Sequence, residues 1–302
     1  MKNNRILAVG SVALDSVETP FGKAKDALGG SATFFSASAR FFSPVSIVAV
    51  VGRDFPQKHL RLIRRLGVNT DGIEVQAGKT FRWKGSYDYD LNNAKTLKTE
   101  LNVFRSFSPK IAEHHRNSPV VFLANIDPDL QRSVLRQIRK PALTACDTMN
   151  YWITNKKRSL LRLMREVDIF LCNDGEARQL SGEASLVSAA KWFLSRGPRL
   201  LVIKKGEHGV LCFSRKTLFS APAFPLEKVF DPTGAGDSFA GGFIGYLSRS
   251  RKLSEQAVRR AVIYGSILAS YNVESFSLNR IARLTRAEIE TRYRQFKRLT
   301  HF

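Results

Sequence analysis

The sequence predicts an α/β fold with a doubly wound, mostly parallel sheet that is flanked by helices. Short apolar runs recur along the chain and are nearly continuous, as in strands that are buried on both faces. Segments with helical periodicity lie between these runs, and this alternation is typical of doubly wound sheets. One region, residues 74–107, breaks the alternation and has a two-residue period instead.

The expected strands are short runs rich in Leu or β-branched residues. They cover residues 5–10, 45–52, 120–125, 142–147, 167–173, 200–206 and 210–214. The expected helices cover residues 31–42, 55–67, 127–140, 185–196, 238–249 and 256–271. The third helix has the clearest start, because Asp127 is a candidate N-cap and Pro128 suits the first turn.

Residues 74–107 predict a small antiparallel sheet inserted into the α/β body. The stretch "FRWKGSYDYD" alternates polar with aromatic residues, and "LNN" is typical of a turn. Such an insertion is expected to cover a site or to form an oligomer contact. We expect all 302 residues to form a single domain.

The chain is strongly basic, with a formal net charge of +22 and an isoelectric point near 10.3. Its densest basic segment, near the C-terminus, predicts a surface helix. The side chains expected to point outward are Arg283, Arg286, Arg292, Arg294, Lys297 and Arg298. No nucleic-acid motif accompanies the charge, so we expect a solvated basic surface, no nucleic-acid partner and a field that favours anionic ligands.

The cysteines Cys146, Cys172 and Cys212 are far apart, and no C-x-x-C pair exists. This pattern predicts free buried thiols in a reducing compartment, and therefore a cytoplasmic protein. No run of about 18 apolar residues is present, so we expect no membrane span. The apolar stretch near the N-terminus is too short for a signal peptide and is expected to be the first strand.

Three short motifs resemble ligand sites without meeting their requirements. "GIEVQAGKT" (72–80) has five residues between its first glycine and the Gly-Lys pair, where a P-loop needs four. "GAGDSF" (234–239) has Phe239 where the dinucleotide fingerprint needs a third glycine. "EHH" (113–115) is expected to be exposed, because adjacent histidines do not share one face of a helix.

The stretch "DPTGAGDSFAGGF" (231–243) carries the clearest chemistry. A buried helix is expected to start near Gly236, which places the glycines at a helix N-terminus, where unpaired N–H groups attract anions. Asp237 in the first turn can accept a proton from an alcohol that attacks phosphorus. The alternative is that Asp237 only caps the helix.

These residues closely resemble the signature D-T-x-G-A-G-D of the PfkB (ribokinase-like) carbohydrate kinases, and the resemblance covers nearly the whole chain. "LGGSATFFSASARF" (28–41) resembles the family's Gly-Gly signature, and "GSVALD" (10–15) resembles its first strand. "NDGE" (173–176) matches its N-x-x-E motif, and "KKGEHGV" (204–210) resembles its nucleotide-side loop. The family's lid would be formed by residues 14–24 and 74–107, approximately.

The resemblance implies a ribokinase-like fold and a role for each matching residue. Asp237 would be the catalytic base, and the anion hole would comprise Gly234, Ala235 and Gly236. Acceptor hydroxyls would be held by Asp15, Gly29 and Gly30. The ATP side would comprise Asn173, Lys204, Gly206 and Gly209. Glu176 would organise Mg²⁺ through water, and Asp231 with Thr233 would hold K⁺ if the enzyme is potassium-activated.

Departures from the family pattern leave the acceptor open. Phe34 stands where many sugar kinases of the family have an Asn, so it either stacks on a ring of the acceptor or belongs to the core. "DTMN" (147–150) resembles a sugar-kinase segment with one extra residue, which makes Asp147 and Asn150 weaker substrate-binding candidates. The lid aromatics either close over an aromatic substrate or pack a lid–lid homodimer. They are Phe81, Trp83, Tyr87 and Tyr89.

We therefore expect an ATP-dependent, magnesium-assisted kinase that phosphorylates a hydroxyl of a small sugar or sugar-like acceptor. A nucleoside kinase of the same superfamily is the first alternative. A catalytically inactive ribokinase-like binding protein is the alternative from another functional class.

Overall fold

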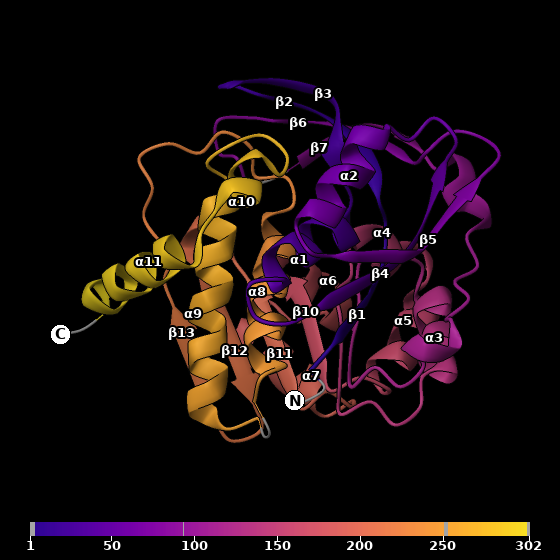
Figure 1. Cartoon of the computed structure of the whole chain (residues 1–302). Coiled ribbons are helices and arrows are strands. Elements are labelled where there is room, and N and C mark those ends of the chain that lie inside the picture. Colours follow the sequence, from indigo (N-terminus) through magenta and orange to yellow (C-terminus); the bar gives the residue numbers. More distant parts are fainter. Residues whose placement is uncertain (1–3, 93, 251–252, 301–302) are drawn as a thin grey trace.

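A nine-stranded sheet forms the centre of the molecule (Figure 1). The structure, a computed structural model, describes residues 4–92, 94–250 and 253–300. The strand order is β13-β12-β11-β10-β9-β8-β1-β4-β5. The strands are β1 (Ile6–Val9), β4 (Val45–Gly52), β5 (Asn69–Gln76), β8 (Val120–Leu123), β9 (Leu143–Cys146), β10 (Ile169–Asn173), β11 (Leu200–Lys204), β12 (Val210–Ser214) and β13 (Leu218–Ala221).

The predicted doubly wound, mostly parallel sheet is confirmed. The pairings from β5 to β11 are all parallel, whereas β12 and β13 are antiparallel. The chain builds outward from β1 first to β4 and β5, and then to β8 on the other side. Open α/β sheets bind ligands at the carboxyl ends of the strands beside such a reversal, which here are the ends of β1 and β8.

Helices cover both faces of the sheet (Figure 1). One apolar core includes residues of α1, α2, α8 and α9, and the other includes residues of α3, α5, α6 and α7. The helices are α1 (Ser31–Ala39), α2 (Gln57–Arg65), α3 (Pro128–Gln137), α4 (Asn150–Asn155), α5 (Lys157–Met164), α6 (Asp174–Ser181), α7 (Leu186–Leu194), α8 (Ala235–Leu247), α9 (Glu255–Asn272), α10 (Asn279–Arg283) and α11 (Arg286–Leu299). The expected cap of α3 is present, because the Asp127 side chain accepts from Asp129 N.

A second sheet of four strands lies above the carboxyl ends of the large sheet (Figure 1). Its order is β3-β2-β6-β7, with β2 (Ala13–Thr19), β3 (Gly22–Gly29), β6 (Arg82–Tyr87) and β7 (Ala94–Glu100). The antiparallel pairing expected within residues 74–107 is confirmed for β6 and β7, and the sheet also includes β2, which runs parallel to β6. Of the stretch expected to form the inserted sheet, residues 74–76 end β5 of the large sheet, and residues 102–106 form a 3₁₀ turn.

The basic C-terminal segment differs from the single surface helix that was expected. Leu284 and Thr285 separate α10 from α11. Arg292 does not point outward, because its guanidinium lies 3.4 Å above the ring of Tyr271 and pairs with Glu274 at 2.6 Å. A cation over an aromatic ring is favoured when it is desolvated, which explains why this arginine is largely enclosed.

The expected free and buried thiols are confirmed for Cys146, Cys172 and Cys212. Burial raises the pKa of the Cys212 thiol to about 12, which keeps it protonated and inert. Across the described residues, no helix is both long and apolar enough to cross a bilayer.

Candidate active site at the carboxyl ends of the strands

The glycine-rich turn lies where the chain enters α8. Gly234 is the residue before the helix and has a left-handed backbone, with φ of +76°. A Cβ atom at this position would lie 2.4 Å from the ring of Phe34, so both the conformation and the space require glycine. Phe34 is only 2% exposed and supports the turn from below. The open alternative for Phe34 is thereby decided in favour of the core, and a stacking role on the acceptor is wrong.

The N-terminus of α8 offers free donors to an anion. The N–H groups of Gly234 and Gly236 have no backbone acceptor among the residues that the structure describes. The N–H of Ala235 donates to Pro232 O at 3.1 Å, so its expected share in the anion hole is wrong in this conformation. Two unpaired N–H groups at a helix start still form a site that stabilises negative charge.

Asp237 lies in the first turn of α8 beside these donors. Its carboxyl is enclosed by its neighbours, although part of its surface remains accessible. Burial raises the pKa of Asp237 to about 7, the Asp147 carboxylate raises it further, and the Lys204 ammonium opposes the rise. A carboxylate that gains a proton near neutral pH is suited to act as a general base.

Lys204 supplies a positive charge next to the turn. It ends β11, and its Nζ donates to Asp147 Oδ2 at 2.5 Å. A Cβ atom at Gly236 would lie 3.1 Å from Nζ, so the ammonium rests against the anion-binding turn. Burial opposes the charge, but Asp147 and Glu176 outweigh it and raise the pKa of Lys204 above its usual value.

Asp147 is held firmly in this cluster. It follows β9 and is 3% exposed, and its backbone oxygen accepts from the buried side-chain amide of Gln131 at 3.1 Å. The same amide reaches the carbonyls of Leu123 and Ala124 at the end of β8. Gln131 therefore ties two strand ends together beneath the site. Its role could not be read from the sequence, because it depends on contacts between separate strands.

Asn173 and Glu176 lie between β10 and α6 and form a capping box. Asn173 Oδ1 accepts from Glu176 N at 2.7 Å, and Glu176 Oε2 accepts from Asn173 N at 2.7 Å. These two reciprocal hydrogen bonds cap the N-terminus of α6. Burial raises the pKa of Glu176 to about 7, Lys204 opposes this rise, and Asp147 adds to it.

Asp15, on β2 of the small sheet, belongs to a second group of acids that includes Asp231. It is 7% exposed, and a Cβ atom at Gly29 would lie 1.9 Å from Asp15 Oδ2, so glycine is required there. Burial raises the pKa of Asp15 to about 7; a hydrogen bond from Gly30 lowers it, and the charges of Asp231 and Asp237 raise it. The predicted residues Asp15, Gly29, Gly30 and Asp237 are therefore brought together.

Asp231 is buried behind the glycine turn. Its Oδ1 accepts from Thr233 N at 2.9 Å, and its Oδ2 accepts from Ser277 N at 3.2 Å. The hydroxyl of Thr233 donates to Tyr87 OH at 3.3 Å. Tyr87 thus reaches the turn from the small sheet, and burial together with the nearby acids raises its pKa to about 12. Its hydroxyl stays protonated at neutral pH.

The other lid aromatics face elsewhere. Phe81 stacks on Phe104, Trp83 donates to Thr96, and Tyr89 is 84% exposed. Asn150, at the start of α4, is exposed. The sequence could not single out Tyr87, because all four aromatics share the same alternating pattern.

The loop after β11 meets the small sheet from the other side. Gly206 and Gly209 form the turn between β11 and β12, both with positive φ. Asn92 Nδ2 donates to Glu207 Oε1 at 3.0 Å, and Asn92 Oδ1 lies 2.2 Å from where a Cβ of Gly206 would be. The connection between β6 and β7 thus contacts the loop that was predicted to face the nucleotide.

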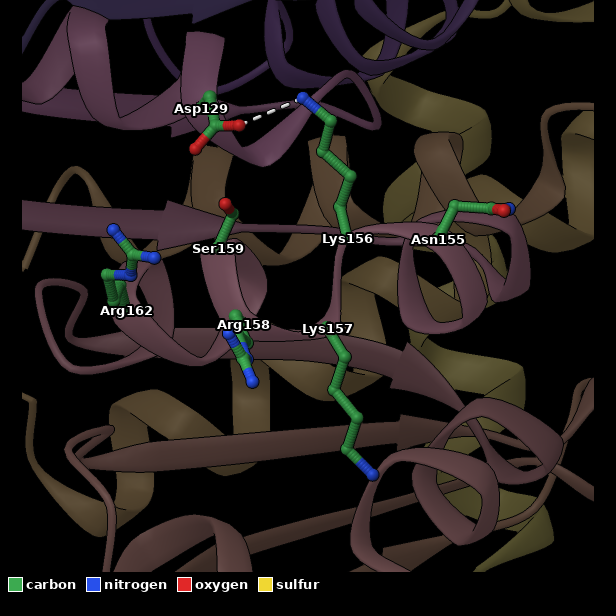
Figure 2. Close-up of a pocket in the computed structure, with 7 residues that line it drawn as sticks. All are labelled: Asp129, Asn155, Lys156, Lys157, Arg158, Ser159 and Arg162. Carbon is green, nitrogen blue, oxygen red and sulfur yellow. Dashed lines mark hydrogen bonds and ion pairs between the residues drawn. The ribbon is translucent and has the colours of Figure 1, made fainter.

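A basic hollow lies apart from this site, over the start of α5 (Figure 2). Figure 2 shows Lys156 turned toward Asp129, to which it donates at 2.9 Å, while Lys157 points away from this pair. The hollow adds to the basic surface and contains no residue of the predicted site. Its lining residues are Asp129, Asn155, Lys156, Lys157, Arg158, Ser159 and Arg162.

Known proteins match the chain over most of its length. The description "pfkB family carbohydrate kinase" matches residues 20–280. A cytidine kinase of Thermococcus kodakarensis is 30% identical over 258 residues, which cover 83% of this chain and 91% of that protein.

Solved structures share the fold. A Burkholderia thailandensis nucleoside kinase in complex with ADP-inosine has a TM-score of 0.80 at 20% identity, covering 96% of this chain and 95% of that one. An Escherichia coli protein described as a candidate ribokinase II, solved with ATP and Mg²⁺, has a TM-score of 0.80 at 18% identity, covering 96% and 99%.

Proposed function

The chain belongs to the pfkB family of carbohydrate kinases, and we propose that within this family it phosphorylates a ribose hydroxyl of a nucleoside. It is an ATP-dependent kinase that transfers the γ-phosphoryl group to a hydroxyl of a small sugar or sugar-like acceptor. The observation that carries the nucleoside proposal is the 30% identity to a cytidine kinase over 91% of that relative.

In the proposed reaction, Asp237 accepts the proton of the attacking hydroxyl. Its raised pKa supports this role, because a base that titrates near the working pH transfers protons efficiently. The N–H groups of Gly234 and Gly236 face the charge that develops on the phosphoryl oxygens, and the Lys204 ammonium beside them adds a fixed positive charge. General-base catalysis of this kind contributes about 10²–10⁴-fold to the rate.

The residues present fit a hard divalent cation and a nucleotide. Mg²⁺ prefers oxygen ligands and keeps several waters, and Glu176 offers a carboxylate that is 9% exposed beside Asn173. We propose that Glu176 holds Mg²⁺ through water, where the ion neutralises phosphate charge. Asn173 and the loop from Gly206 to Gly209 would face the nucleotide.

Asp15 and Tyr87 are proposed to hold the acceptor. Asp15 lies on β2 of the small sheet near Asp237, and carboxylates bind vicinal sugar hydroxyls well because they accept two hydrogen bonds. Tyr87 closes the same space from above and remains a hydrogen-bond donor. A free sugar is the second candidate acceptor, because these contacts require only hydroxyl groups.

Three further proposals concern the protein's working state. K⁺ would share the carboxylate of Asp231, whose oxygens already accept from Thr233 N and Ser277 N. A homodimer would use the outer side of the small sheet, where Tyr89 is 84% and Leu97 47% exposed. A cytoplasmic location is supported by the three free thiols.

An acceptor panel tests the proposed function. ADP release is measured with ATP and Mg²⁺, with and without K⁺, against cytidine, inosine, adenosine, ribose and fructose. We expect a nucleoside to have the highest kcat/KM and to give a monophosphate of the matching mass. A higher kcat/KM for ribose or fructose would replace the nucleoside proposal with the sugar. Absence of ADP release on every acceptor, together with salt-dependent nucleic-acid binding, would favour a binding protein instead.

A further inference from the structure

Three metal-binding side chains converge at the opposite end of the sheet from the kinase site. Asp71 lies on β5, and His114 and His115 form a single 3₁₀ turn before β8. His114 Nε2 lies 3.0 Å from Asp71 Oδ2, and His115 Nε2 lies 2.9 Å from Asp71 Oδ1. One nitrogen or carboxylate oxygen from each residue lies within 4.8 Å of the others.

The expectation that "EHH" is simply exposed is therefore wrong. Adjacent side chains diverge on an α-helix, whereas this segment makes one 3₁₀ turn in which the two imidazole ring centroids lie 4.0 Å apart. His115 is completely buried, and His114 remains 57% exposed. The sequence also gave no sign of Asp71, which lies more than forty residues earlier.

The geometry points to a transition-metal site: we propose that Asp71, His114 and His115 bind one Zn²⁺, Co²⁺ or Ni²⁺ ion through both Nε2 atoms and a carboxylate oxygen. Two imidazoles and one carboxylate are a donor set that these ions favour over Mg²⁺. On binding, each neutral imidazole places its proton on Nδ1 and gives the Nε2 lone pair to the ion. The exposed sides of His114 and Asp71 leave a coordination position for water.

Hydrogen bonds from neighbouring residues orient the Asp71 carboxylate better than they orient the two imidazoles. Asn69 orients Asp71, since its Oδ1 accepts from Asp71 N at 2.8 Å and its Nδ2 donates to Oδ2 at 3.3 Å. His115 Nδ1, in contrast, has no partner among the described residues. Loss of such an outer partner typically weakens metal binding by about 10–100-fold, so we expect a moderate affinity.

The position of the site indicates a structural role. Asn69 pairs with Ser46 near the start of β4, so Asp71 lies toward the amino ends of the parallel strands. The kinase residues lie at the carboxyl ends. A bound ion would join the edge strand β5 to the segment that leads into β8, and would raise the thermal stability without entering the phosphoryl-transfer reaction.

Cobalt titration of the full-length, chelator-treated protein tests the site. In the absence of nucleotide, we expect one equivalent of Co²⁺ to give visible d–d absorption, to be displaced by Zn²⁺, and to raise Tm. Millimolar Mg²⁺ should not compete, because it prefers an all-oxygen environment. Asp71→Asn and His114→Gln should each weaken Co²⁺ binding by about 10–100-fold. Both positions are partly exposed, so these variants are expected to fold.

Glu113→Gln is the matched control. Glu113 lies in the same turn but pairs with Arg116 and Arg139, so its loss should leave Co²⁺ affinity unchanged. The proposal is overturned if the wild type binds no stoichiometric Co²⁺. It is also overturned if Asp71→Asn and His114→Gln bind as tightly as the wild type, which would assign the ion to another site such as the acids around Asp237.

Discussion

The two halves of the proposed kinase site are built from similar acids but differ in their partners. On the phosphoryl side, Asp147 and Glu176 surround the Lys204 ammonium at the ends of β9, β10 and β11. On the acceptor side, the described residues provide Asp15 and Asp231 with backbone N–H donors and no ion pair to Lys or Arg. Asp237 lies between the halves, because Asp147 and Lys204 shift its pKa and its own charge raises the pKa of Asp15.

Because of this difference, the two halves of one site favour ligands of different charge. A fixed cation and free N–H groups favour the phosphates of ATP on one side. Buried carboxylates without a cationic partner disfavour an anion on the other side, because like charges repel strongly where water is excluded. We therefore expect a neutral polyhydroxylated acceptor, which agrees with a nucleoside or a free sugar and disfavours a sugar phosphate or a sugar acid.

The largest effect is expected where the halves meet. Asp237→Asn keeps the shape of the side chain but removes the base, so kcat should fall by about 10²–10⁴-fold. ATP affinity, measured by calorimetry without acceptor, should change little, because the N–H groups of the turn remain. A variant that keeps near wild-type turnover with its best acceptor would show that Asp237 only caps α8.

A smaller effect is expected from the acceptor half alone. Tyr87→Phe removes the hydroxyl that accepts from Thr233, and the loss of about 0.5–1.5 kcal/mol should raise the acceptor KM by about 2–12-fold with little change in the KM for ATP. Tyr89→Phe is the control, because Tyr89 is 84% exposed and contacts Phe21 only at its ring edge. Equal effects of the two substitutions, or a larger change in the KM for ATP, would argue against closure by Tyr87.

The features that could be predicted from the sequence are local ones. Continuous apolar runs predicted the parallel strands. The helical spacing of the apolar residues after Asp237 predicted the helix start at the glycine turn. The edge strands β5 and β13 were harder to predict from the sequence. β13 has only four residues, of which Leu218 and Ser220 are exposed, and the β5 segment mixes polar with apolar residues, so neither has the pattern of a buried strand.

Features that depend on distant contacts could not be predicted. The sequence left open whether Phe34 stacks on the acceptor or belongs to the core, and only its packing against Gly234 distinguishes the two. The loss of the Ala235 donor depends on the turn geometry at Pro232. The ion pair between Lys204 and Asp147 joins the ends of separate strands, and no local sequence pattern predicts it. The chemistry of the glycine turn could therefore be predicted from the sequence, whereas the neighbouring residues that adjust its charge and shape could not.

We propose that Asp237 is a base whose pKa is raised by burial and adjusted by the charges of the phosphoryl half. Burial raises that pKa most, Asp147 raises it further, and Lys204 lowers it. Asp147→Asn removes a negative charge and releases Lys204 from its partner, and both changes favour the Asp237 carboxylate.

The acidic limb of kcat/KM against pH, measured side by side for the wild type and Asp147→Asn, tests this claim most directly. The wild-type rate should fall as the pH drops through about 7, and the limb should move to lower pH in the variant. An acidic limb that stays in place or moves to higher pH would contradict the account.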